Sequence, residues 1–141
     1  MTVRLRSHHL LCMLTFVGEG YNPAFRANYR QIAKRLSAGE DILLVSGPDD
    51  ICAPLVGCND SLCHGAGVEM RDATAAEAVG LLLKQEISPG LSIRPDATLV
   101  EKLRMAFAAG DIRSACHGCE WESLCSRVAG HSFRGVLVVP P

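Results

Sequence analysis

The sequence has neither an excess of charge nor a long apolar segment. Its 14 Lys and Arg residues balance 15 Asp and Glu residues and leave a formal charge of −1. Such a balance gives no electrostatic reason to expect nucleic acid or an anionic membrane as a partner. No apolar run approaches the roughly 18 residues that a membrane-spanning helix needs. We therefore expect neither kind of partner.

The N-terminal segment lacks the features of a secretory signal. MTVRLRSHHLLCMLTFVGEG has a basic start and a short apolar stretch, but His8 and His9 interrupt the stretch. No small-residue cleavage site follows them. This pattern predicts a cytoplasmic protein, and disulfides are rare in that compartment.

The familiar signatures of catalysis are missing as well. The sequence contains no phosphate-binding loop, no G-x-S-x-G and no H-E-x-x-H. Asp49 and Asp50 are adjacent carboxylates, but they follow Gly-Pro in a turn, where Asp is favoured for backbone reasons. The sequence therefore indicates no stand-alone enzyme and names no substrate or oligomeric state.

What the chain does have is enough apolar sequence for one folded domain. Its 141 residues, 48% of them apolar, suit a single domain over residues 1–141. The expected fold class is α+β and mainly helical, with four to five helices, a small two- or three-stranded sheet and two cysteine-bearing loops. Caps and apolar periodicity predict helices over 7–17, 23–39, 74–85 and 95–110, and strands at 3–6, 42–45 and 135–139.

Seven cysteines are many for a cytoplasmic chain, and metal or redox chemistry is the usual explanation. Three of them, Cys116, Cys119 and Cys125, follow a C-x2-C-x5-C pattern in CHGCEWESLC. Two thiolates separated by two residues can bind one metal, because the turn between them points both sulfurs the same way. The spacing resembles the last three ligands of the 4Fe–4S loop in helix-hairpin-helix DNA glycosylases. The fourth cysteine of that loop would fall near Ala109, so the resemblance implies a ligand type and not a glycosylase.

A second group of thiols lies in ICAPLVGCNDSLCHG. It holds Cys52, Cys58 and Cys63, followed by His64. A single cysteine without a function can be a small, unreactive core residue. This explanation does not suit six cysteines that lie in two polar loops. We expect a metal centre held by four ligands from Cys52, Cys63, Cys116, Cys119 and Cys125, ahead of Cys58, Cys12 and His64.

The cysteine spacing favours an iron–sulfur cluster over zinc. Structural zinc sites usually pair two C-x2-4-C knuckles, and this chain has only one. Clusters tolerate wide and uneven spacings, because each thiolate binds a different iron atom. The hypothesis is thus a cluster-binding protein, most simply 4Fe–4S, with a redox, sensing or assembly role and a protein redox partner. A zinc-stabilised interaction module and a metal-free thiol redox protein are the alternatives.

The segment HHLLC near the N-terminus has ligand-compatible spacing on a helix. His8 and Cys12 stand at i and i+4, and His9 and Cys12 at i and i+3. However, apolar residues surround Cys12 in the sequence, so we expect it to pack in the core. We expect His8 and His9 to point toward the cysteine loops and to support the ligands from a second shell.

These segments together carry a family resemblance. LRSHHLLCMLTFVGEGYNPAF, VSGPDDICAPL, CH at 63–64, ACHGCEW and LC at 125 occur in this order. The chain resembles, from about Leu5 to Cys125, the small bacterial and archaeal family numbered 1284 among the domains of unknown function. The resemblance implies iron–sulfur binding without an established activity, and it supports Cys12, Cys52, Cys63, Cys116, Cys119 and Cys125 as site residues. Some relatives carry a further cysteine where this chain has Leu55. Cys58 either substitutes for it or is incidental, which leaves the fourth ligand open.

Overall fold

The computed structural model of the chain describes residues 2–18, 23–46, 49–51, 66–112 and 122–140. Within them the chain forms five helices and a three-stranded sheet, so the expected α+β, mainly helical class is confirmed. The two cysteine-bearing loops lie outside the described residues. In order, the elements are β1 (Thr2–Leu5), α1 (His9–Cys12), α2 (Pro23–Ser37), β2 (Asp41–Leu44), α3 (Ala66–Leu83), β3 (Ser92–Ile93), α4 (Ala97–Ala109) and α5 (Glu122–Gly130).

The sheet joins the N-terminal strand to the middle of the chain. Its order is β1-β2-β3, with β1 parallel to β2 and β2 antiparallel to β3. Val3 and Leu5 alternate with exposed residues along β1, and both are fully buried. This alternation buries one face of the strand, as a half-covered sheet requires.

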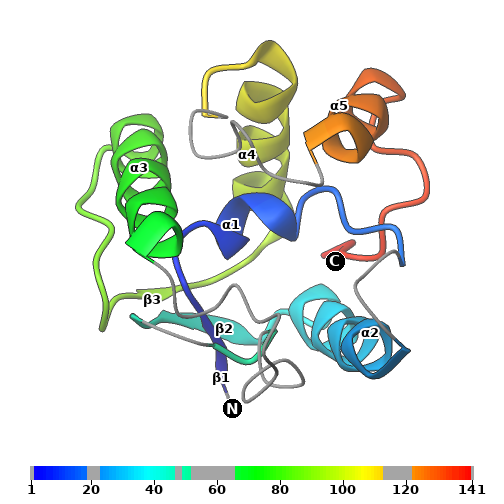
Figure 1. Cartoon of the computed structure of the whole chain (residues 1–141), viewed down its shortest axis with the longest axis horizontal. Coiled ribbons are helices and arrows are strands. Elements are labelled where there is room, and N and C mark those ends of the chain that lie inside the picture. Colours follow the sequence, from blue (N-terminus) through cyan, green and yellow to red (C-terminus); the bar gives the residue numbers. More distant parts are fainter. Residues whose placement is uncertain (1, 19–22, 47–48, 52–65, 113–121, 141) are drawn as a thin grey trace.

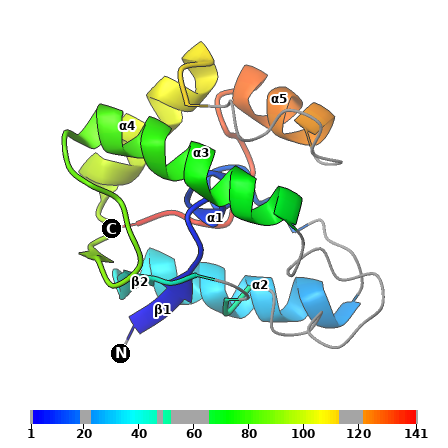
Figure 2. The same ribbon diagram turned by 60° about the vertical axis from the view of Figure 1, so that its left-hand side comes forward.

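Helix α1 lies at the centre of the molecule. Figures 1 and 2 show it above the sheet and α2, with α3 on one side and α5 on the other. Its apolar residues Leu10 and Leu11 belong to the core, as do Met13 and Leu14 directly after it, and all four are almost completely buried. This packing holds the short helix in place and thereby sets the direction of the polar residues that it carries.

Two of the predicted helices match the structure closely, because their caps are local. Helix α2 begins at Pro23, and Gly39 follows its end with φ +88°. Helix α4 has Asp96 as its N-cap, whose carboxylate accepts a hydrogen bond from Leu99 N at 2.8 Å. Gly110 forms its left-handed C-cap with φ +87°.

Other boundaries differ from the prediction. Helix α1 ends at Cys12 instead of continuing to Val17, and the next residues form turns through bonds such as Thr15 N to Cys12 O. The chain then places Phe16 against Tyr29 of α2, with ring centroids 3.8 Å apart. Helix α3 begins at Ala66, so the predicted capping box at residues 74–77 lies inside it. The added part of the helix carries Asp72, which contacts Arg6 and His8, and the buried Ala75 and Val79 follow it.

The C-terminal segment was predicted as a strand but pairs with no strand among the described residues. It is held by single contacts instead. Leu137 N donates to Phe16 O at 2.9 Å, and Val139 N donates to the Ser37 hydroxyl at 2.8 Å. Arg104 of α4 donates to Val138 O at 2.7 Å. The segment therefore links the turns after α1 to α2 and α4, and it does not extend the described sheet.

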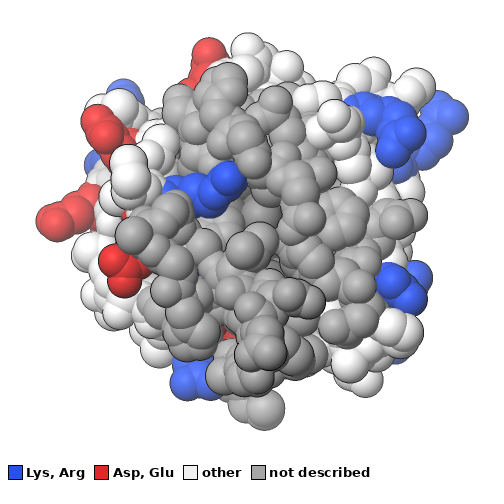
Figure 3. Space-filling model, viewed as in Figure 1, with Lys and Arg blue, Asp and Glu red and all other residues white. Residues whose placement is uncertain are grey.

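The described helices and the surface agree with the balanced composition. None of these helices combines the length and the apolar character that crossing a bilayer requires. In Figure 3, acidic side chains gather mainly on the side of α3, whereas basic ones lie on both sides and also cluster on the side of α5. This face therefore does not carry a single field of one sign.

Candidate metal centre

His8, His9 and Cys12 come together at α1 and form what we call the His/Cys group. One ring nitrogen from each histidine and the Cys12 sulfur all lie within 4.8 Å of one another. The two rings have centroids 4.3 Å apart and are tilted by 54°. This follows from the helical spacing of HHLLC, which stacks the side chains one turn apart. The three residues can therefore hold a metal ion.

Asp72 of α3 orients His8. The His8 Nδ1 and Asp72 Oδ1 are 2.7 Å apart, and the His8 backbone N–H donates to the same oxygen at 3.1 Å. The other carboxylate oxygen, Oδ2, accepts a bond from Arg6 Nε at 2.8 Å. Because Arg6 has a side chain only 1% exposed, this ion pair is buried, and it fixes the carboxylate against the ring.

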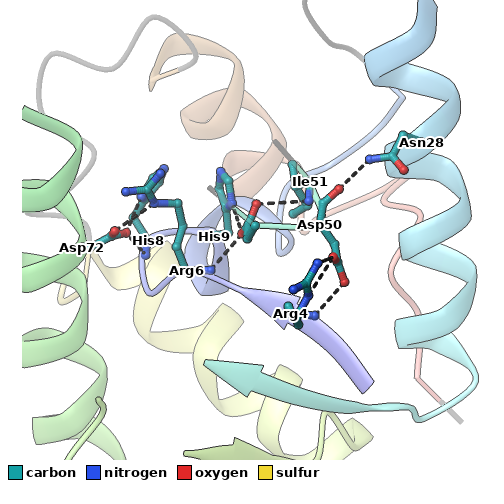
Figure 4. Close-up of polar contacts among 9 residues, drawn as sticks. Arg4, Arg6, His8, His9, Asn28, Asp50, Ile51 and Asp72 are labelled. Atoms are coloured by element: carbon teal, nitrogen blue, oxygen red, sulfur yellow. Dashed lines mark hydrogen bonds and ion pairs between the residues drawn. The ribbon is translucent and has the colours of Figure 1, made fainter. Parts of the chain in front are cut away.

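Asp49 orients His9 in a similar way. The His9 Nδ1 lies 2.6 Å from Asp49 Oδ2, which also accepts the Arg6 backbone N–H at 2.8 Å. The second oxygen accepts the Ile51 backbone N–H at 3.1 Å, and the Asp49 side chain is fully buried. The next residue, Asp50, instead pairs with the exposed Arg4 (Figure 4). Each histidine thus has its own immobilised carboxylate.

The electrostatics keep His8 neutral at ordinary pH. Burial, followed by the neighbouring charges of His9 and Arg6, lowers the pKa of His8 to about 4, although Asp72 acts in the opposite direction. Burial alone would raise the pKa of Asp72, but the hydrogen bonds from His8 and Arg6 outweigh it and lower that pKa. His8 is therefore a neutral ring facing an ionised carboxylate.

The carboxylates also decide which ring nitrogen can bind a metal. An ionised carboxylate only accepts hydrogen bonds, so Nδ1 of each histidine carries the proton. In the neutral form of the ring, which His8 adopts, the lone pair then resides on Nε2. Among the described residues, none makes a hydrogen bond with Nε2 of His8 or His9. A carboxylate–histidine pair of this kind is the usual outer support of a histidine that ligates a metal.

Helix α5 brings a further cysteine to the same region. Thr15 Oγ1 lies 3.1 Å from Cys125 Sγ, and Thr15 also donates to the Cys12 carbonyl at 3.4 Å. Cys125 is half-buried and packs against the core. The last cysteine of the C-x2-C-x5-C pattern is therefore anchored to the turn that follows the His/Cys group.

The predicted ligands are only partly covered by the described residues. Cys12 and Cys125 are described, and Cys12 is half-buried although its apolar neighbours are buried. His8 and His9 belong to the His/Cys group. The remaining candidates, Cys52, Cys58, Cys63, His64, Cys116 and Cys119, lie outside the described residues.

The described ends of the first cysteine segment are nevertheless informative. Ile51, directly before Cys52, shares the Asp49 carboxylate with His9. Helix α3 begins at Ala66, shortly after His64, and its Asp72 holds His8. The residues just before the first cysteine segment thus contact His9, and the helix that follows the segment contacts His8.

Sequence reasoning missed the residues that orient the histidines. It interpreted Asp49 as a turn residue and did not single out Asp72, Arg6 or Thr15. The adjacent carboxylates at 49 and 50 were the one available signal. Asp72 had none, because its partner His8 is 64 positions away in the sequence.

Comparison with known proteins gives one result. The family model described as "Protein of unknown function (DUF1284)" matches residues 20–125. No curated protein and no solved structure matches the chain significantly.

Proposed function

We propose a function for this chain, which belongs to the DUF1284 family of proteins of unknown function. The chain binds a metal centre next to α1, and the centre is an iron–sulfur cluster, most simply 4Fe–4S. Its role is redox transfer, sensing or cluster assembly with a protein partner. A cytoplasmic location, where thiols stay reduced, fits this role.

The observation that carries the proposal is the contact between Thr15 and Cys125. It joins the C-terminal cysteine segment to the turn after Cys12. Asp49 and Asp72 connect the two ends of the other cysteine segment to His9 and His8. Three parts of the chain that carry thiols in the sequence are thereby tied to one short helix.

This convergence supports the ligand set expected from spacing. Four of Cys52, Cys63, Cys116, Cys119 and Cys125 bind the cluster, ahead of Cys58, Cys12 and His64. Uneven spacing suits a cluster, because its iron atoms lie apart and each takes its own thiolate. The short C-x2-C pair supplies two neighbouring ligands, and Cys125 supplies one from α5.

Zinc is the second candidate, and the two Asp–His pairs favour it. In many zinc sites, a carboxylate accepts a hydrogen bond from the histidine ring nitrogen that does not bind the metal. Cys and His together also form ordinary tetrahedral zinc sites. In that case the centre stabilises an interaction module and carries no electrons.

Anaerobic purification of the full chain distinguishes these candidates. A cluster predicts a brown sample with broad visible absorbance and with iron and acid-labile sulfide bound together. A colourless sample with stoichiometric zinc supports the second candidate. A sample that binds neither after reconstitution overturns both and leaves a metal-free thiol protein.

A further inference from the structure

The two histidines beside the cysteines are more than hydrogen-bonding residues. We infer that His8 and His9 are themselves ligands of the centre, each through Nε2, and that Asp72 and Asp49 are the residues that position them. The inference rests on the proposed function, because it concerns the same centre. It changes the ligand set from thiolates alone to a mixture of nitrogen and sulfur.

The first argument is the orientation of the rings. Both histidines direct Nδ1 to a carboxylate, at 2.7 Å for Asp72 and 2.6 Å for Asp49. Each carboxylate is in turn held by other donors, including the side chain or the backbone of Arg6. In both histidines, Nδ1 is therefore bound to a carboxylate, and Nε2 is available to a metal.

The second argument is burial. The side chains of His8 and His9 are only 17% and 12% exposed. Neither Nε2 makes a hydrogen bond with another described residue, and neither is among the fully buried polar atoms left without a partner. A metal could therefore bind either Nε2 without displacing a described side chain.

The third argument is distance. The candidate ligand atoms of the His/Cys group lie within 4.8 Å of one another. Two nitrogen ligands of one tetrahedral zinc are roughly 3.3 Å apart, given bond lengths of about 2.0–2.1 Å. One ring nitrogen of each histidine and the Cys12 sulfur are thus close enough to belong to one metal centre. On a cluster, the same atoms can address neighbouring irons.

Mixed ligation has a chemical consequence. Histidine is neutral where cysteine is anionic, so replacing thiolate ligands by imidazole raises the reduction potential of a cluster. In a zinc centre, the same ligands complete a nitrogen–sulfur site of the usual tetrahedral kind.

Spectroscopy of the metal-loaded full chain tests the inference directly. For a reduced cluster, pulsed electron paramagnetic resonance should show strongly coupled ¹⁴N that changes when histidine is labelled with ¹⁵N. For zinc, X-ray absorption should show nitrogen at about 2.0–2.1 Å beside sulfur at about 2.3 Å. A centre with sulfur ligands alone overturns the inference and leaves the proposed function standing. A chain that binds no metal overturns both.

A substitution separates ligation from hydrogen bonding. His8→Asn keeps an N–H donor near the position of Nδ1, so it can still bind Asp72, but it has no counterpart of Nε2. It should fold as the parent does and lose one nitrogen coupling. If His8 only binds Asp72, His8→Asn will retain full metal affinity and an unchanged spectrum. That result overturns the role of His8, and His9→Asn tests His9 in the same way.

The positioning carboxylates have a matched control in Asp50. Asp72→Asn should weaken metal binding by about 10- to 100-fold, as loss of an outer carboxylate does elsewhere. Asp50→Asn removes a carboxylate that pairs with Arg4 and should leave affinity unchanged. Equal affinities in both variants, with both folded by circular dichroism, would show that Asp72 positions no ligand.

Discussion

Thr15 Oγ1 and Cys125 Sγ lie 3.1 Å apart, although 110 positions separate the two residues in the sequence. The contact joins α5 to the turn after α1, where His8, His9 and Cys12 gather. It brings a predicted ligand to the turn that follows this group. Hydrogen bonds to sulfur tune metal centres, so we expect Thr15 to influence the proposed centre if Cys125 is a ligand.

The first prediction concerns Cys125. Cys125→Ser should lower the bound iron or zinc after reconstitution, because a weakly ligating hydroxyl replaces a thiolate. Metal analysis per chain and the visible spectrum measure the effect. Cys58→Ser is the matched control, since Cys58 ranks below the five expected ligands. Full metal content in Cys125→Ser, or equal losses in both variants, would remove Cys125 from the ligand set.

The second prediction concerns the buried arginine. Arg6→Met should lower the free energy of unfolding by about 3–5 kcal/mol, because it leaves the Asp72 charge without its ion-pair partner in a largely buried place. Arg4→Met, in which the lost side chain is 63% exposed, should cost about 1 kcal/mol or less. Urea unfolding of the metal-free chains measures both. Similar losses for the two variants would contradict the role given to burial.

The third prediction is a pH dependence of the metal-free chain. The pKa of His8 lies near 4 in the folded chain, below its ordinary value of 6.5. Between these two values the unfolded chain binds the proton and the folded chain does not, so stability falls as the pH drops. Between pH 6.5 and about pH 4, His8 alone lowers the free energy of unfolding by about 3 kcal/mol.

Nuclear magnetic resonance of the imidazole signals should show His8 neutral down to about pH 4. Chemical unfolding across the same range should show the falling stability. The His8→Asn variant should lose this part of the slope. A His8 ring that titrates near its ordinary value would refute the prediction, because it would show that burial does not govern the ring.

The fourth prediction concerns metal removal. Residues 52–67 and 111–127, which lie largely outside the described residues, have few large apolar side chains to offset their ordering entropy. We expect them to lose hydrogen-exchange protection when the metal is removed. Helices α2 and α4 should keep theirs, because Tyr29, Ile32 and Leu103 are buried in the core. Equal protection with and without metal would show that the centre does not order these segments.

The sequence by itself determined the elements whose signals are local. Pro23 and Gly39 mark the limits of α2, and Asp96 and Gly110 cap α4, because caps act within a few residues of the helix end. Alternation of apolar and charged residues likewise predicted β1, and the apolar run at 42–45 predicted β2. The spacing of HHLLC already contained the His/Cys group, although it did not indicate how the rings are held.

Only the tertiary structure decided how that group is oriented. Asp72 reaches His8 from 64 positions away, and Asp49 reaches His9 from 40. Contacts of this range leave no periodic or capping pattern in the sequence, since they depend on how α1 packs between α3 and the sheet. The limits of α1 at Cys12 and of α3 at Ala66 also differ from the local signals. The added part of α3 carries Asp72, and its contacts with Arg6 and His8 exist only because segments distant in sequence pack together.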